Sequence, residues 1–225
     1  VIQGAWALLL SRYLNRDTVC FGATTSGRPT DMNGSNTCLG MFINTIPVIT
    51  EIDPAQSLIT WLQSIQNANV RSRESEFTPL YDIQKQAGQH LELNKEGLFD
   101  TLMVFENYPI SEALQSEERH DTSFDVVHSE EETNYPVSVE VDIAALLKIT
   151  LTYQSDKVST PSASRLSEQL GSLILAMVAN QSAILSELSL VTSAQAESLQ
   201  VHGFGDEFTP YLVGVETPIY LPNGD

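Results

Sequence analysis

The sequence has little cysteine, little histidine and little basic charge, and each shortage excludes a class of function. Its two cysteines, Cys20 and Cys38, lack a CxxC spacing and a histidine cluster, so we expect buried free thiols and no zinc or redox centre. No two of its 4 histidines stand one, three or four positions apart, which disfavours a metal site. Lysine and arginine number 11 against 29 acidic residues, and the net charge of -18 would repel nucleic acid and anionic membranes.

Long apolar runs and the common nucleophile and phosphate motifs are also missing. No run is long enough to cross a bilayer, and no basic segment of a signal peptide is present. The chain opens inside a helical pattern, which we expect to be a cut in a longer sequence. Neither GxSxG nor GxxxxGK[ST] occurs, and Gly203-Phe204-Gly205 lacks the third glycine of a dinucleotide loop. Serine-hydrolase and nucleotide-binding functions are therefore not expected.

What the sequence does contain is an alternation of helical and strand patterns, with 42% hydrophobic residues. Apolar spacing predicts helices over 2–13, from Asp53-Pro54 to about residue 75, over 78–86 and from residue 162 onward. It predicts strands over 18–25, 39–48, 98–107 and 124–128, and a hairpin of 137–143 and 147–153. We expect an α/β fold, a two-layer sandwich in which helices cover a mixed β-sheet. This domain should end near residue 192, leaving 193–225 as a linker-like tail.

Polar residues accompany the first two predicted strands, where a plain core strand would carry more valine or isoleucine. They are Thr24, Ser26, Arg28 and Asn44. Burying an asparagine costs ~1–3 kcal/mol unless it is hydrogen-bonded, so Asn44 either satisfies a neighbouring group or faces a ligand. The sequence leaves both possibilities open. Ser26, which precedes Gly27, is more typical of a serine that caps a turn than of a nucleophile.

The acidic stretch over 111–121 offers the other candidate for chemistry. His120 lies beside Asp121 and close to Glu117 and Glu118, which is compatible with an acid–base or metal cluster. Charge-rich stretches of this kind are usually solvated surface loops. The solvated loop is therefore the favoured interpretation of this segment.

Five segments, in this order, carry a resemblance to a known family. They are Gln3-Gly4-Ala5-Trp6 and the runs from Phe21 to Pro29, from Gly40 to Val48, from Thr78 to Gln84 and from Phe99 to Pro109. Together they resemble the C-terminal lobe of the condensation domain of nonribosomal peptide synthetases, over residues 1 to about 192. The resemblance implies a half-domain with a chloramphenicol-acetyltransferase-like fold.

The resemblance also implies partners and a site. In that family two lobes enclose a channel that admits phosphopantetheine arms from a donor and an acceptor peptidyl carrier protein, and the acceptor amine attacks the donor thioester to form a peptide bond. The chain would be a cytoplasmic part of secondary-metabolite or antibiotic biosynthesis. It would bind no cofactor directly and would work with an N-terminal lobe, both carrier proteins and adjacent synthetase domains.

Particular residues match motifs of the family. Asn44 falls in the motif that lies along the channel, while Gly27, Arg28 and Pro29 shape the loop that leads into it. The run from Phe105 to Pro109 is similar to the form found in condensing members, whereas epimerising relatives tend to differ there. The resemblance therefore favours peptide-bond formation over epimerisation.

One motif of the family is missing. HHxxxDG, which carries the histidine credited with assisting the attack, has no match in the 225 residues. No catalytic residue is therefore assigned, and the chain alone is expected to be inactive. A second hypothesis is a non-catalytic module of the same fold that docks or recruits carrier proteins. A third, a stand-alone acyltransferase, would need the missing motif.

Overall fold

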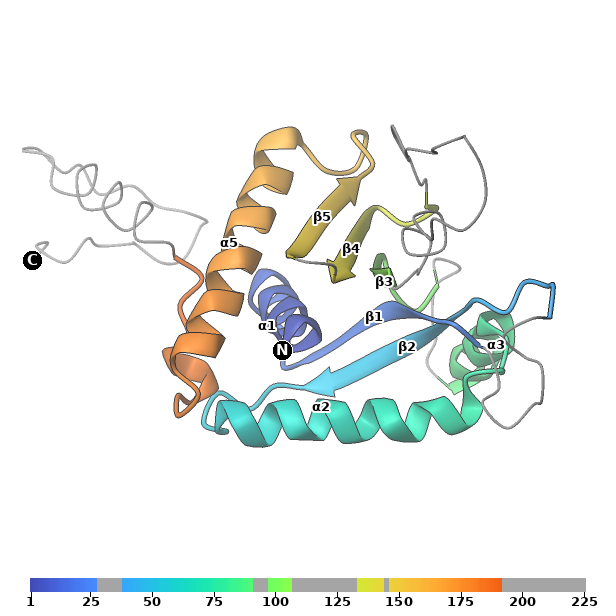
Figure 1. The fold of residues 1–225 in the computed structure, drawn as a ribbon, viewed down its shortest axis with the longest axis horizontal. Coiled ribbons are helices and arrows are strands. Elements are labelled where there is room, and N and C mark those ends of the chain that lie inside the picture. Colours follow the sequence, from blue (N-terminus) through green and yellow to red (C-terminus); the bar gives the residue numbers. More distant parts are fainter. Residues whose placement is uncertain (28–37, 91–96, 107–132, 144–145, 192–225) are drawn as a thin grey trace, which may run out of the picture. The chain divides into compact units, whose positions relative to one another are not determined.

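The computed structural model describes residues 1–27, 38–90, 97–106, 133–143 and 146–191 (Figure 1). By its internal contacts the chain divides into two units, Val1–Leu188 and Ser189–Asp225, and the described helices and strands all belong to the first unit. The strand predicted over 124–128 and the acidic stretch with His120 lie outside the described residues.

Five described strands form one mixed sheet in the order β2-β1-β3-β4-β5. Their bounds are β1 Thr18–Thr25, β2 Asn44–Glu51, β3 Thr101–Glu106, β4 Val137–Ile143 and β5 Leu147–Tyr153. β1 is antiparallel to β2, and β4 is antiparallel to β5, whereas β3 is parallel to both of its neighbours, β1 and β4. The predictions of a mixed sheet and of a β4–β5 hairpin are confirmed.

Helices cover one face of this sheet. The register places Ala23, Met103 and Val139 side by side on that face, where all three are buried. Helix α1 (Ile2–Leu14) packs between β1 and α5 (Thr160–Ala179), and α2 (Leu58–Ser72) lies along β2 (Figure 1). The remaining helix, α3 (Leu80–His90), packs against β2 and is separated from α2 by the 3-10 turn Arg73–Ser75. A second 3-10 turn, Leu185–Glu187, follows α5. The predicted α/β fold with helices on a mixed sheet is confirmed.

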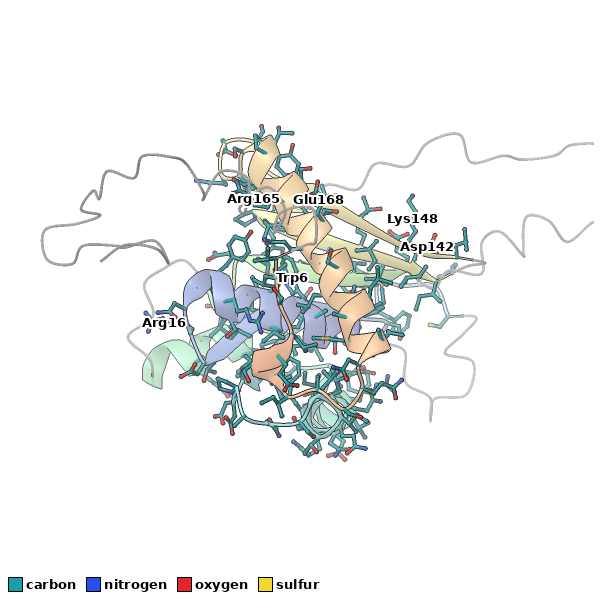
Figure 2. All side chains as sticks on the ribbon, turned by 90° about the vertical axis from the view of Figure 1, so that its left-hand side faces the viewer. Trp6, Arg16, Asp142, Lys148, Arg165 and Glu168 are labelled. Carbon is teal, nitrogen blue, oxygen red and sulfur yellow. The ribbon has the colours of Figure 1, made fainter. Side chains whose placement is uncertain are left out.

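Two tryptophans fix the helices to the strands. The Trp6 indole N–H donates to the Thr101 hydroxyl over 3.3 Å, which joins α1 to β3, and the Trp61 indole N–H donates to the Glu51 carbonyl over 2.8 Å, which joins α2 to β2. Both rings are 1% exposed. Figure 2 shows Trp6 among the packed side chains, with the charged side chains of Arg16 and Glu168 directed outward. Aromatic side chains of this size contribute strongly to core stability because they bury a large apolar area.

The second predicted strand begins later than expected. Residues 39–43 were predicted to be its first half, but β2 starts at Asn44 and continues to Glu51. Leu39 and Met41 are 98% and 94% exposed, so the apolar residues that suggested a strand are not part of the core. The strand predicted over 98–107 is likewise shorter and begins at Thr101.

The predicted start of the second helix is wrong as well. Ser57, not Asp53, is the N-cap of α2, and its side chain accepts a hydrogen bond from the Thr60 backbone N–H. The segment before it stays outside the helix because it pairs with the chain after α5: Leu185 N–H donates to the Gln56 carbonyl over 3.0 Å and Ser186 N–H donates to the Pro54 carbonyl over 2.9 Å. Tertiary pairing has therefore overridden the local capping signal.

Two smaller expectations also fail. Gly88 was predicted to follow the end of its helix but lies inside α3, where a side chain would meet no atom within 4 Å. Cys20 and Cys38 are thiols and not disulfide partners, as expected, but each is only partly buried, whereas buried thiols were expected. Burial raises the pKa of the Cys20 thiol to about 11. No described helix is long and apolar enough to cross a membrane.

Candidate functional site

A cavity of about 1240 Å³ lies at the edge of the sheet where β1 ends and β2 begins. β1 and β3 are parallel, so their C-terminal ends meet at this edge. The strands contribute Ala23 to Thr25, Ile46 and Val104 to the wall, and the helical side contributes Gln3 from α1 and Asn69 from α2. The wall is mainly apolar and hydroxyl-bearing, which is typical of a pocket that binds a ligand.

Gly27 directs the chain out of β1 at the cavity. Its φ is 57°, in the left-handed region, and an added Cβ would lie 1.9 Å from the Phe42 carbonyl oxygen. Only glycine therefore allows the end of β1 to approach the segment before β2 this closely. The approach brings the hydroxyls of Thr24 and Ser26 together with Phe42 in one wall.

The four predicted site residues do not all lie in the cavity wall. Thr24 and Ser26 line the cavity, whereas Arg28 lies outside the described residues. Asn44, the first residue of β2, is not in the cavity wall. Its side-chain NH₂ donates to the carbonyls of Glu76 (2.7 Å) and Thr78 (2.9 Å). Asn44 therefore satisfies neighbouring groups, and a contact between its remaining amide oxygen and a ligand stays a prediction.

We expect Asn44→Ala to lower the free energy of unfolding by about 1–3 kcal/mol, because two carbonyls lose the donor that holds them. Urea unfolding of the 225-residue chain measures this loss. Asn44→Asp is the matched variant: it keeps the size of the side chain but replaces the donating NH₂ by an acceptor, so it should be at least as destabilising as alanine. Wild-type stability in both variants would contradict the structural role of the amide.

Several wall residues were missed by the sequence analysis. Gln3 and Asn69 come from different helices, and the Asn69 side chain donates to the Gln3 side-chain oxygen across the cavity wall. Thr25 follows a predicted site residue, and its hydroxyl is buried and has no hydrogen-bond partner among the described residues. The run of three hydroxyl residues at 24–26 is the one local signal that pointed to Thr25. No local pattern could have selected Gln3 or Asn69.

The charged groups of the wall are few. Among the described residues that line the cavity, Arg73 and Glu76 are the ionisable ones, and none is histidine. No group of three or more His, Cys, Asp or Glu side chains that could hold a metal occurs in the described part of the chain. As described, the wall can orient and bind by hydrogen bonding and by charge.

Comparison with known proteins shows which family the chain belongs to. Residues 1–200 match the family model described as the condensation domain. The chain belongs to the condensation-domain family. This condensation-domain chain is 35% identical over 201 residues to one of the subunits of linear gramicidin synthase from Brevibacillus parabrevis, covering 89% of the chain and 2% of that much longer protein. It is 31% identical over 200 residues to surfactin synthase subunit 3 of Bacillus subtilis (strain 168), covering 88% of the chain and 15% of that protein.

Solved structures show the same fold. A four-domain nonribosomal peptide synthetase bound to AMP and glycine superposes with a TM-score of 0.71 at 20% identity, covering 88% of this condensation-domain chain and 16% of the other. The first condensation domain of the CDA synthetase superposes with a TM-score of 0.63 at 14% identity, covering 85% of this chain and 41% of the other. The chain thus spans less than half of each solved protein, and the likeness establishes the condensation-domain fold.

Proposed function

We propose that this chain is the C-terminal lobe of a condensation domain that joins two carrier-bound aminoacyl or peptidyl groups through a peptide bond. The proposal rests on the extent of the structural match: 85% of this chain covers only 41% of a solved condensation domain. A second lobe, carrying HHxxxDG, would complete the cavity at the sheet edge. Residues 1–192 would form this lobe and 193–225 the connection to an adjacent synthetase domain, in the cytoplasm.

The proposed chemistry is the attack of an acceptor amine on the carbonyl of a donor thioester. The C–N bond forms, the C–S bond breaks, and the amine loses a proton while the departing sulfur gains one. Holding the two groups in attack geometry can contribute on the order of 7–11 kcal/mol without a strong acid or base on this lobe. Each group would enter the cavity on the phosphopantetheine arm of its carrier protein, and Thr24 and Ser26 in the wall are available to bind it.

The test compares the 225-residue chain with a two-lobe domain that adds the preceding lobe of the natural polypeptide. Both receive a donor and an acceptor carrier protein loaded with amino acids, and mass spectrometry measures the dipeptide on the acceptor. We expect product with two lobes and only the uncatalysed background with the chain alone. Product from the chain alone would refute the half-enzyme proposal, and so would a two-lobe domain that forms none.

A carrier-docking module without chemistry is the competing hypothesis, and the lack of histidine among the described wall residues is the observation in its favour. It predicts that a phosphopantetheinylated carrier protein binds the chain while the two-lobe domain forms no peptide bond. Comparison of the chain alone with the two-lobe domain therefore distinguishes the two functions.

A further inference from the structure

One acidic residue stands in the cavity wall without an explained role. Glu76 follows the 3-10 turn that ends α2 and lines the cavity, and it is partly buried. The nearby Glu74 also belongs to this segment, but it is exposed and is not in the wall. The chain has a net charge of -18, and acidic residues at a protein surface commonly serve solubility. A carboxylate in a large cavity calls for a different explanation.

The backbone of Glu76 is held in place from two sides. Its carbonyl accepts the Asn44 side chain over 2.7 Å, and its N–H donates to the Arg73 carbonyl over 3.4 Å. The same Asn44 NH₂ holds the Thr78 carbonyl, so the residues on either side of Phe77 are fixed to the start of β2. The backbone of Glu76 is therefore held by the first residue of β2, beside the cavity.

The Glu76 carboxylate has no ion pair or hydrogen bond to any described residue, Arg73 included. Thr25 also belongs to the cavity wall, but its hydroxyl oxygen is enclosed by protein atoms and has no hydrogen-bond partner among the described residues, so it does not face the cavity. The wall thus offers one anionic group, Glu76, whose side chain the described residues leave unpaired.

We propose that Glu76 binds the amino group of the acceptor substrate. A partly desolvated carboxylate attracts a cation more strongly than one in water, and a primary amine is cationic when it enters at neutral pH. The inference rests on the proposed function, which requires an amine in this cavity. Beyond that function, the charge of the Glu76 carboxylate distinguishes a free, cationic amine from a neutral, acylated one.

The first test measures binding and needs no peptide bond. The 225-residue chain is titrated with a glycyl amide of aminopantetheine, whose amine is free, and with its N-acetyl derivative, which is neutral. Calorimetry should show a preference of about tenfold or more for the free amine in the wild type, the effect of one charge-assisted hydrogen bond. Glu76→Gln should lose this preference and leave the affinity for the N-acetyl probe unchanged, whereas Glu76→Asp should keep part of it.

Glu74→Gln is the matched control, because it removes the same charge two residues away from outside the cavity wall. It should keep the wild-type preference. Equal preference in wild type and Glu76→Gln, or equal losses in both glutamine variants, would overturn the inference. Thermal unfolding of each variant shows whether a loss reflects unfolding, and the retained N-acetyl binding serves as an internal control for the fold.

The second test uses the two-lobe domain with glycine on the acceptor carrier protein. Glu76→Gln should raise KM for the acceptor by about tenfold and change kcat less, as expected for lost substrate binding. If the wild type forms peptide bonds but shows no preference for the amine probe, the proposed function stands and this inference fails. If it prefers the amine probe through Glu76 but forms no peptide bond, the amine site stands and the proposed function fails.

Discussion

Gly27→Ala is expected to be among the most damaging single substitutions in the described part of the chain. An alanine Cβ would lie 1.9 Å from the Phe42 carbonyl oxygen, and alanine disfavours the φ of 57°. The clash is with backbone, so a side-chain rotation cannot relieve it. We expect the free energy of unfolding to fall by at least about 2 kcal/mol, and peptide formation by the two-lobe domain to fall by at least about tenfold.

The control for this substitution is Gly88→Ala. Gly88 lies inside α3, and a Cβ there would meet nothing within 4 Å. Alanine is the better helix former by ~1 kcal/mol, so this variant should be as stable as the wild type or slightly more stable. Urea unfolding monitored by tryptophan fluorescence measures both variants. Gly27→Ala behaving like Gly88→Ala would show that the close approach of β1 to Phe42 is not required.

Trp61→Ala should remove about 3–5 kcal/mol from the free energy of unfolding. The ring is 1% exposed and packs beside α1, where its Cζ3 atom lies 3.2 Å from the position of a Cβ on Gly4. The substitution leaves a large cavity between the helices. It also leaves the Glu51 carbonyl without the indole N–H that donates to it over 2.8 Å. Both effects loosen the attachment of α2 to β2.

Urea unfolding again measures the loss, with Ile59→Ala as the control from the same helix. Ile59 is 45% exposed, so its truncation should cost less than about 1 kcal/mol. Trp61→Phe should fall between the two, because it keeps most of the ring but loses the hydrogen bond. A loss below about 1.5 kcal/mol for Trp61→Ala would contradict the anchoring role of this ring.

The sequence predicted the central architecture because the strands carry strong local patterns. β4 and β5 alternate apolar and polar residues, and their pairing across a short connection was predicted correctly. The predicted start of β2 was wrong because Leu39 and Met41 are apolar but exposed. Apolar character alone does not distinguish a core strand from an exposed segment. The predicted start of α2 was wrong because Gln56 pairs with Leu185, more than a hundred residues away in the sequence, and this pairing holds the residues before Leu58 outside the helix.

The candidate site could be predicted only where it lies on the strands. Thr24 and Ser26 stood out because polar residues interrupt an apolar run, and both line the cavity. Asn69 lies near the end of α2 and Glu76 follows the 3-10 turn after it, and their place in the wall depends on how α2 lies along β2. This packing depends on contacts between segments distant in the sequence, which a local sequence pattern does not reveal.

The placement of β3 bears on how the lobe can fold. Each edge of the sheet is an antiparallel pair of strands that are close in sequence, but the six residues Thr101–Glu106 join the two halves through parallel partners. Gly22 and Leu102 are opposite each other although 80 positions separate them. Closing so long a segment is entropically unfavourable and slow, so the pairing of β3 with β1 raises the contact order of the lobe. During synthesis on the ribosome, β1 and β2 must therefore wait for β3 before the sheet can become continuous.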